Sequence, residues 1–216
     1  MNIFIIDIVI NFSIVIAAII GVIRFKSVLA AYHPFLFLIW LGLLNETLSI
    51  ILIYTVKSNA VNSNTFVLLE YALILLQFYR WNGNSRKKYY WLACFGFAVW
   101  IADNFIINTI TENNSLFRVF YSFVIVFFSI DQVNKIIIFE KGSLLKNAMF
   151  IICITFLFYY GCNAFVEAFN MFHVGLSDGL LENLWIILYF VNFIANLIYA
   201  LAILCIPTKQ KFTFPC

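Results

Sequence analysis

The chain has 216 residues, of which 64% are hydrophobic and 11% are charged, and its mean hydropathy is +1.00. Soluble domains carry about 25% charged residues, so this composition excludes an ordinary soluble globular protein and predicts an integral membrane protein. The formal net charge is only +3, and we attribute it to membrane topology, with no nucleic acid as a partner.

Seven apolar stretches follow one another, each of about the 20 residues that a helix needs to cross a hydrocarbon core of ~30 Å. They run roughly over residues 3–23, 34–56, 64–81, 89–110, 116–138, 146–170 and 183–206. The breaks between them are rich in Asn, Ser, Gly and charged residues, which is typical of turns. The predicted fold is therefore a single all-α domain over residues 1–216, a bundle of seven transmembrane helices embedded in the lipid bilayer.

The basic residues predict the orientation of this bundle. Only two of the 13, Lys57 and Arg118, fall on the side of the membrane that carries the N-terminus. The other 11 fall on the opposite side and are Arg24, Lys26, Arg80, Arg86, Lys87, Lys88, Lys135, Lys141, Lys146, Lys209 and Lys211. Because cytoplasmic loops are enriched in Lys and Arg, we expect the N-terminus outside and the C-terminus in the cytoplasm, in a plasma or inner membrane.

Six of the ten carboxylates fall within the apolar stretches, where an ionised side chain costs at least ~3 kcal/mol near the centre of the bilayer. They are Asp7, Glu46, Glu70, Asp103, Asp131 and Glu167. A rise of about 1.5 Å per residue from the expected helix ends places Glu46 about 18 Å, and Glu70 and Asp103 about 21 Å, from the inner face. No Lys or Arg is expected at that depth, so at least one of Glu46 and Glu70 should be protonated.

Amide and aromatic side chains are expected around the same layer. By the same count Asn11, Asn45 and Asn192 lie at a similar depth, and Asn163 lies somewhat further out. A polar layer built from several helices is too costly to face lipid, so it should face a cavity or a hydrogen-bonded core. An acid with aromatic walls can hold an organic cation through charge pairing and cation–π contact. The predicted ligand site comprises Glu46, Glu70, Asp103, Asn11, Asn45, Asn192, Asn163, Tyr71 and Trp100.

A second interpretation of these residues needs no ligand. Protonated acids, Asn and Tyr also join membrane helices by hydrogen bonds, at about 0.6 kcal/mol for each contact. For any single residue both interpretations stay open. Asp131 is a separate case, because it lies four residues before Lys135 and close to the inner face, which predicts a local ion pair or a cytoplasmic-side network.

Several kinds of chemistry lack the residues that they need. The only two histidines, His33 and His173, lie near opposite ends of spans, so no zinc site of the HxxxH kind is expected, and neither a metal nor a cofactor is predicted. The spans and their orientation are similar in architecture to rhodopsins and seven-helix receptors. However, the seventh span contains no lysine for a retinal Schiff base.

Three functions remain, and we rank them in order. The first is a receptor-like sensor that binds a small solute, such as an organic cation, in the outer half and signals to a cytoplasmic or membrane partner. The second is a proton-coupled transporter that uses the same acids, although no repeat or broken helix supports it. The third is an intramembrane lipid hydrolase with paired acids as general acid and base. An enzyme is therefore the less favoured class.

Overall fold

The structure is a computed structural model that describes residues 10, 12–82, 86–140, 142–172 and 178–208. These residues form seven α-helices, and the one β-bridge that they contain is an isolated antiparallel pairing of Val28 with Thr208. The all-helical class that the sequence predicts is therefore confirmed for the described part of the chain.

Six helices are long and apolar enough to cross a membrane, which is consistent with a helical membrane bundle. The seven α-helices are α2 (Ile14–Arg24), α3 (His33–Val56), α4 (Ala60–Asn82), α5 (Arg86–Ile101), α6 (Leu116–Phe139), α7 (Ala148–Phe172) and α8 (Asp178–Cys205). A π-helical turn, Ala102–Ile107, continues α5. Helices α3 to α8 correspond to six of the seven predicted spans. Of the first predicted span, 3–23, the helix that is described is α2, whose 11 residues are shorter than a crossing requires.

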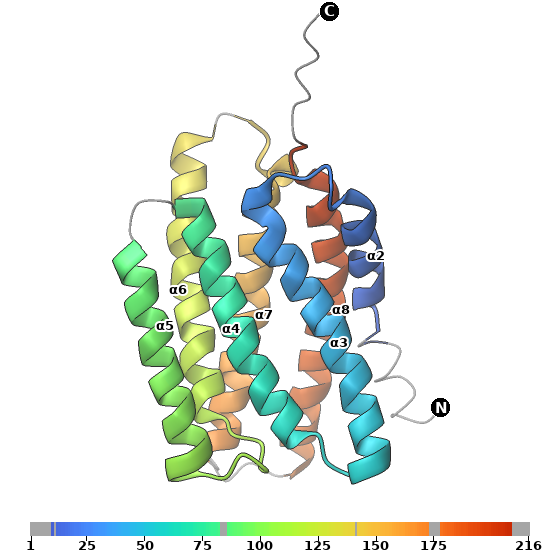
Figure 1. Cartoon of the computed structure of the whole chain (residues 1–216), viewed down its shortest axis with the longest axis vertical. Coiled ribbons are helices and arrows are strands. Elements are labelled where there is room, and N and C mark those ends of the chain that lie inside the picture. Colours follow the sequence, from blue (N-terminus) through green and yellow to red (C-terminus); the bar gives the residue numbers. More distant parts are fainter. Residues whose placement is uncertain (1–9, 11, 83–85, 141, 173–177, 209–216) are drawn as a thin grey trace, which may run out of the picture.

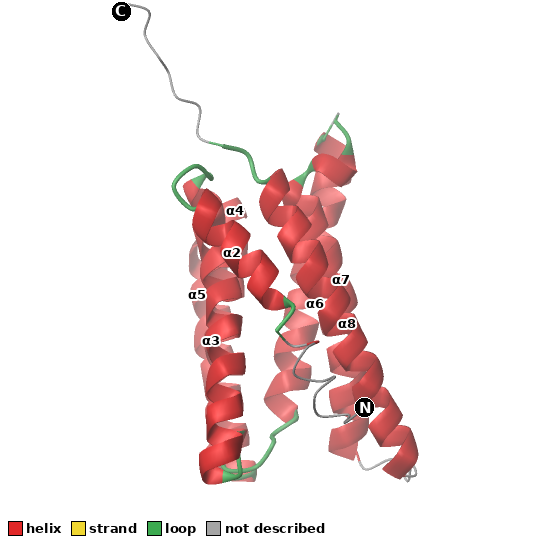
Figure 2. Cartoon of the chain, turned by 90° about the vertical axis from the view of Figure 1, so that its right-hand side faces the viewer, coloured by secondary structure: helices red, strands yellow, loops and turns green. Residues whose placement is uncertain are grey.

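The long helices run side by side along the bundle (Figure 1), and their contacts join α2, α3, α4, α6, α7 and α8 into a ring with α5 outside it. Helix α7 packs between α6 and α8, α2 packs between α8 and α3, and α4 lies beside α3. Figure 2 shows α3, α4 and α5 on one side of the bundle and α6, α7 and α8 on the other. Helix α5 contacts α4 and α6 and is the least embedded of the six long helices.

Polar side chains from other elements satisfy several helix ends, where backbone groups have no partner within the helix. At the start of α3, the Phe35 amide donates to Gln77 Oε1 at 2.8 Å, and Gln77 Nε2 donates to the carbonyl of Ala31 at 2.8 Å. At the end of α8, the Arg24 guanidinium donates to the carbonyls of Ile203, at 2.6 Å, and Leu204, and to that of Ile206 just after the helix. These bonds connect α3 to α4 and α2 to α8.

A glycine on α5 lets a tyrosine side chain of α4 pack directly against the α5 backbone. A Cβ atom on Gly96 would lie 2.3 Å from Cε1 of Tyr71, whose side chain is buried on α4. The Tyr71 hydroxyl donates to the carbonyl of Leu92 on α5 at 2.9 Å. The ring of Tyr71 can therefore lie directly on the α5 backbone only because residue 96 has no side chain.

Aromatic rings fill the centre of the bundle. Phe35, Phe78 and Phe156 are each 0% exposed, and the ring of Phe156 contacts the other two edge to face. Large apolar side chains also cover the outer surface, as Trp91 at 72% and Phe127 at 67% exposure illustrate. An apolar exterior of this kind fits lipid and does not fit water.

Candidate functional site

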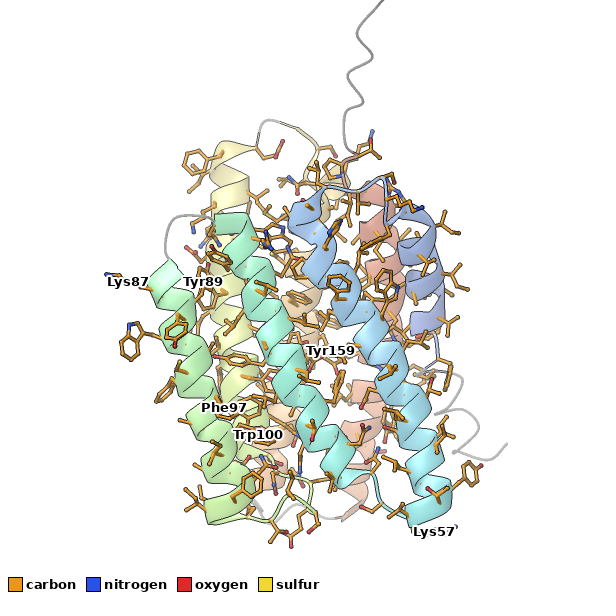
Figure 3. All side chains as sticks on the ribbon, viewed as in Figure 1. Lys57, Lys87, Tyr89, Phe97, Trp100 and Tyr159 are labelled. Carbon is orange, nitrogen blue, oxygen red and sulfur yellow. The ribbon has the colours of Figure 1, made fainter. Side chains whose placement is uncertain are left out.

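A cavity of about 640 Å³ lies at the end of the bundle where α3 turns into α4, which we call the large cavity. Lys57, labelled in Figure 3, marks this end, and Lys87 marks the other. The lining comes from Phe12 and from the near ends of α3, α4, α6, α7 and α8. It comprises Arg118, Glu46 and Glu167, the amides of Asn45, Asn59, Asn113 and Asn170, the hydroxyl groups of Ser49, Ser63 and Tyr189, and Phe12, Ile50, Ile53 and Trp185. Polar and charged groups therefore dominate its wall.

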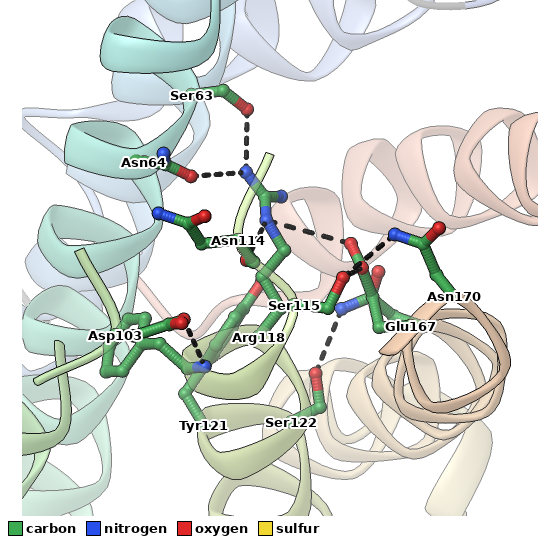
Figure 4. A network of polar contacts seen from close by, with 12 residues as sticks. Ser63, Asn64, Asp103, Asn114, Ser115, Arg118, Tyr121, Ser122, Glu167 and Asn170 are labelled. Carbon is green, nitrogen blue, oxygen red and sulfur yellow. Dashed lines mark hydrogen bonds and ion pairs between the residues drawn. The ribbon is translucent and has the colours of Figure 1, made fainter. Parts of the chain in front are cut away.

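Arg118 is the cation in the wall of the large cavity, and its side chain joins α6 to α4 and α7 (Figure 4). Its Nη2 donates to Ser63 Oγ at 2.8 Å and to Asn64 Oδ1 at 3.4 Å, both on α4. Its Nε donates to the carbonyl of Asn114 at 3.2 Å and lies 3.7 Å from Glu167 Oε1 on α7. The guanidinium is thus held in place before any ligand arrives.

Glu167 completes this network from the opposite side. Its side chain is 3% exposed, and its Oε2 accepts a hydrogen bond from Ser115 Oγ at 2.7 Å. The same hydroxyl oxygen accepts one from Asn170 Nδ2 at 2.9 Å. Glu167 therefore has a cation and a hydroxyl donor, and its position is defined by both α6 and α7.

Glu46 lines the large cavity and also a second, deeper one of about 80 Å³, the small cavity. The lining of the large cavity includes one guanidinium, that of Arg118, and two carboxylates, those of Glu46 and Glu167. Beside Glu46, Asn45 Oδ1 accepts a hydrogen bond from Asn62 at 2.9 Å. Glu46 is half-buried on α3 and stands at the boundary between the two cavities.

The small cavity lies between α2, α3, α4, α7 and α8 and is lined by Glu70 as well as Glu46. Its polar lining comprises Glu46, Glu70, Tyr159, Tyr160, Asn192, Asn196 and Tyr199, and its apolar lining comprises Ile14, Leu38, Ile39, Gly42 and Phe66. A water occupies about 30 Å³ of liquid, so the volume suits two or three waters or one small polar group. Figure 3 shows Tyr159 near the middle of the bundle.

Glu70 is 8% exposed and accepts hydrogen bonds from two buried tyrosines. The Tyr160 hydroxyl on α7 donates to Oε1 at 2.9 Å, and the Tyr121 hydroxyl on α6 donates to Oε2 at 3.0 Å. One carboxyl group on α4 therefore connects three helices. Tyr199, which lines the small cavity, packs edge to face on the buried rings of Phe35 and Phe156 behind it.

The structure brings Glu46, Glu70 and Asn192 together around the small cavity and leaves Asp103 outside both cavities. Asp103 is 0% exposed and lies in the π-helical turn after α5. Its Oδ2 accepts from the amide of Phe117 at 2.8 Å, and its Oδ1 accepts from Asn108 Nδ2 at 2.9 Å. The acid therefore caps the start of α6, where free amides and the helix dipole favour a negative group.

Three further predicted site residues also line neither cavity and join helices instead. Trp100 Nε1 donates to the carbonyl of Asn64 at 2.7 Å, and Asn163 Nδ2 donates to Ser122 Oγ at 2.9 Å. Tyr71 bonds to α5 as described above. Asn45 does line the large cavity, whereas Asn11 lies outside the described residues.

Asp131 and Lys135 form an ion pair one turn apart on α6, with Nζ 2.7 Å from Oδ2. Lys135 Nζ also donates to Asn82 Oδ1 on α4 at 3.2 Å. Both side chains are about half exposed, at 50% and 45%. This network lies at the end of the bundle opposite to the large cavity, since Asn82 ends α4.

Sequence reasoning missed Arg118 as a site residue. The expectation that no basic side chain reaches the acidic layer is wrong, because Arg118 lines the large cavity together with Glu46. Its position two residues inside α6 was the available signal, since a long side chain at a helix end can turn toward a polar interior. Glu167 was recognised as an intramembrane acid, but its pairing with Arg118 was not.

Within the described residues, no group of three or more His, Cys, Asp or Glu side chains could hold a metal ion. No protein-family description matches the chain, and comparison with curated proteins and with solved structures gives no match either. The residues that line the cavities therefore carry the functional argument alone.

Proposed function

We propose that the protein is a receptor-like membrane sensor that binds a small, cationic polar solute in the large cavity. The observation that carries this proposal is the lining of a cavity of about 640 Å³ by two carboxylates, one guanidinium and four amides. Small-molecule sites typically have volumes of about 300–1,000 Å³ and a few fixed polar groups. The lining holds two carboxylates and one guanidinium, so acidic groups outnumber basic ones and suit a cationic ligand. We assign the contact with the cationic group of the ligand to Glu46, because this residue lines both cavities.

The orientation is part of this proposal. With 11 of 13 basic residues on the side of the C-terminus, the N-terminus and the large cavity would face outward. The solute would then come from outside the cell or from the periplasm. The connections at the other end are short, so the output would pass to a cytoplasmic or membrane partner.

Binding should appear as thermal stabilisation of the purified protein. We would compare primary amines, quaternary ammonium compounds and carboxylates of matched size, at concentrations up to 100 times the dissociation constant, where a ligand stabilises by about 2.7 kcal/mol. Cations should raise the melting temperature of the parent and raise that of Glu46→Gln much less. Glu112→Gln is the control, because Glu112 is exposed at the same end and does not line the cavity. Equal stabilisation of the parent and Glu46→Gln, or stronger stabilisation by carboxylates, would contradict the proposal.

Cysteine labelling tests the orientation separately. In a variant whose natural cysteines are replaced, Asn113→Cys in the wall of the large cavity should react with an impermeant thiol reagent added to intact cells. Lys146→Cys, exposed at the other end, should react only after the membrane is permeabilised. The reverse pattern would show that the cavity faces the cytoplasm.

A proton-coupled transporter is the second candidate, and one observation favours it. Glu46 lines both cavities, so polar space continues from the large cavity toward the middle of the bundle. A transporter would accumulate the cation found above in proteoliposomes when a pH gradient is applied, whereas a sensor would bind it without accumulation. Loss of uptake in Glu46→Gln would then assign the acid to coupling.

A further inference from the structure

Helix α5 is the least embedded part of the bundle and leaves space beside it. In the apolar segment of 18 residues that represents each long helix, 17% of α5 is buried inside the protein, against 28–44% for the other five. A groove of about 300 Å³ lies between α5 and α6, on the outer surface of the bundle. Most of the bundle's apolar surface meets lipid, so a lipid chain is the natural occupant of such a groove.

The groove is apolar along its length and charged at one end. Its wall comprises Leu92, Val124, Phe127, Phe128, Lys88 and Asp131. Leu92, Val124 and the two phenylalanines supply its apolar surface, and Phe127 is 67% exposed. Lys88 lies in the first turn of α5, at the start of the candidate membrane span, and forms one end of the groove wall.

The charges at this end favour an anion. Lys88 Nζ lies 4.6 Å from the centre of the Phe128 ring, and the exposed Lys87 precedes it (Figure 3). Arg80, also exposed, lies near the end of α4 on the same side of the bundle. The carboxylate of Asp131 has its own cation, because Lys135 Nζ lies 2.7 Å away. Because Asp131 is paired with Lys135, Lys87 and Lys88 give this end of the groove a net positive charge that can attract an anionic group of a ligand.

We propose that the α5–α6 groove binds an acyl chain of an anionic phospholipid whose phosphate lies against Lys87 and Lys88. The lysine stems can run along the apolar wall while the ammonium groups reach the headgroup region. Each basic residue near an anionic membrane surface contributes about 1 kcal/mol, which corresponds to about a five-fold change in affinity. This site is distinct from both cavities and does not depend on their ligand.

The headgroup test compares phosphatidylglycerol with phosphatidylcholine of identical chains, added to the full-length protein in detergent and counted by native mass spectrometry. The parent should bind phosphatidylglycerol more tightly. Lys87→Gln and Lys88→Gln should each weaken that binding about five-fold. Lys57→Asn removes the same charge at the opposite end of the bundle and should leave the affinity unchanged. Absence of a preference for phosphatidylglycerol, or an equal loss in Lys57→Asn, would overturn the proposal.

The groove itself is tested by filling it. Val124→Trp places a large ring in the groove from a half-buried position on α6. We expect at least a five-fold loss of affinity for phosphatidylglycerol and a melting temperature, measured without added lipid, close to that of the parent. Unchanged lipid affinity in this variant would show that the acyl chain lies elsewhere and would overturn the proposal.

Discussion

Replacement of Glu70 by leucine is expected to lower the free energy of unfolding by about 2–4 kcal/mol. The reason is the pair of buried hydroxyl groups, Tyr121 and Tyr160, that donate to this carboxyl group at 3.0 and 2.9 Å. Each buried donor left without an acceptor costs about 1–3 kcal/mol. The measurement is thermal or SDS-induced unfolding of the purified protein in detergent.

Two further variants identify the cause of this loss. Glu70→Gln keeps an acceptor and adds donors that a tyrosine oxygen can accept, so it should remain near the parent. The triple variant Glu70→Leu, Tyr121→Phe, Tyr160→Phe removes donors and acceptor together and should recover most of the stability. If the triple variant is as unstable as Glu70→Leu, shape and not hydrogen bonding accounts for the effect.

Replacement of Arg118 by methionine should be the second large perturbation, at about 2–4 kcal/mol. It removes the bonds from α6 to Ser63 and Asn64, and it leaves Glu167, 3% exposed, without its cation. Breaking a buried ion pair costs about 3–5 kcal/mol. We place the effect slightly lower, because Arg118 is 15% exposed and the Nε to Oε1 distance is 3.7 Å.

A double-mutant cycle isolates the charge contribution from the packing. Adding Glu167→Gln to Arg118→Met should restore part of the loss, since the amide needs no cation. Arg118→Lys should lie between the parent and Arg118→Met, because it keeps the charge and loses the planar donor group. If Arg118→Met with Glu167→Gln is no more stable than Arg118→Met alone, the ion pair contributes nothing measurable and the hydrogen bonds to α4 account for the loss.

The helices from residue 33 onward were predictable because their signal is local. In lipid, each span must pair its backbone polar groups by hydrogen bonds within its own helix. The length of an apolar stretch is therefore enough to predict a span. The expected span 116–138 differs from α6, Leu116–Phe139, by one residue. The predicted end of the fourth span, at residue 110, was less accurate. Helix α5 ends at Ile101, and the π-helical turn that continues it ends at Ile107.

Depth along a helix was a partial guide to the site. It correctly brought Glu46 near Glu70, since both line the small cavity. It gave no information on the direction in which a side chain points around the helix axis, and Asp103 illustrates this limit. The same depth was compatible with a cavity or with a helix cap, and the bond to the Phe117 amide assigns it to the cap.

Composition, hydrophobic length and the placement of charges along the chain therefore established an all-helical membrane protein with acids inside it, because these properties belong to single helices. The tertiary structure alone decided which acids meet. It turned Arg118 inward to Glu167, gave Glu70 two tyrosines from different helices, and placed Glu46 between two cavities. These contacts depend on how the helices rotate and pack against one another, and that is a property of no single segment.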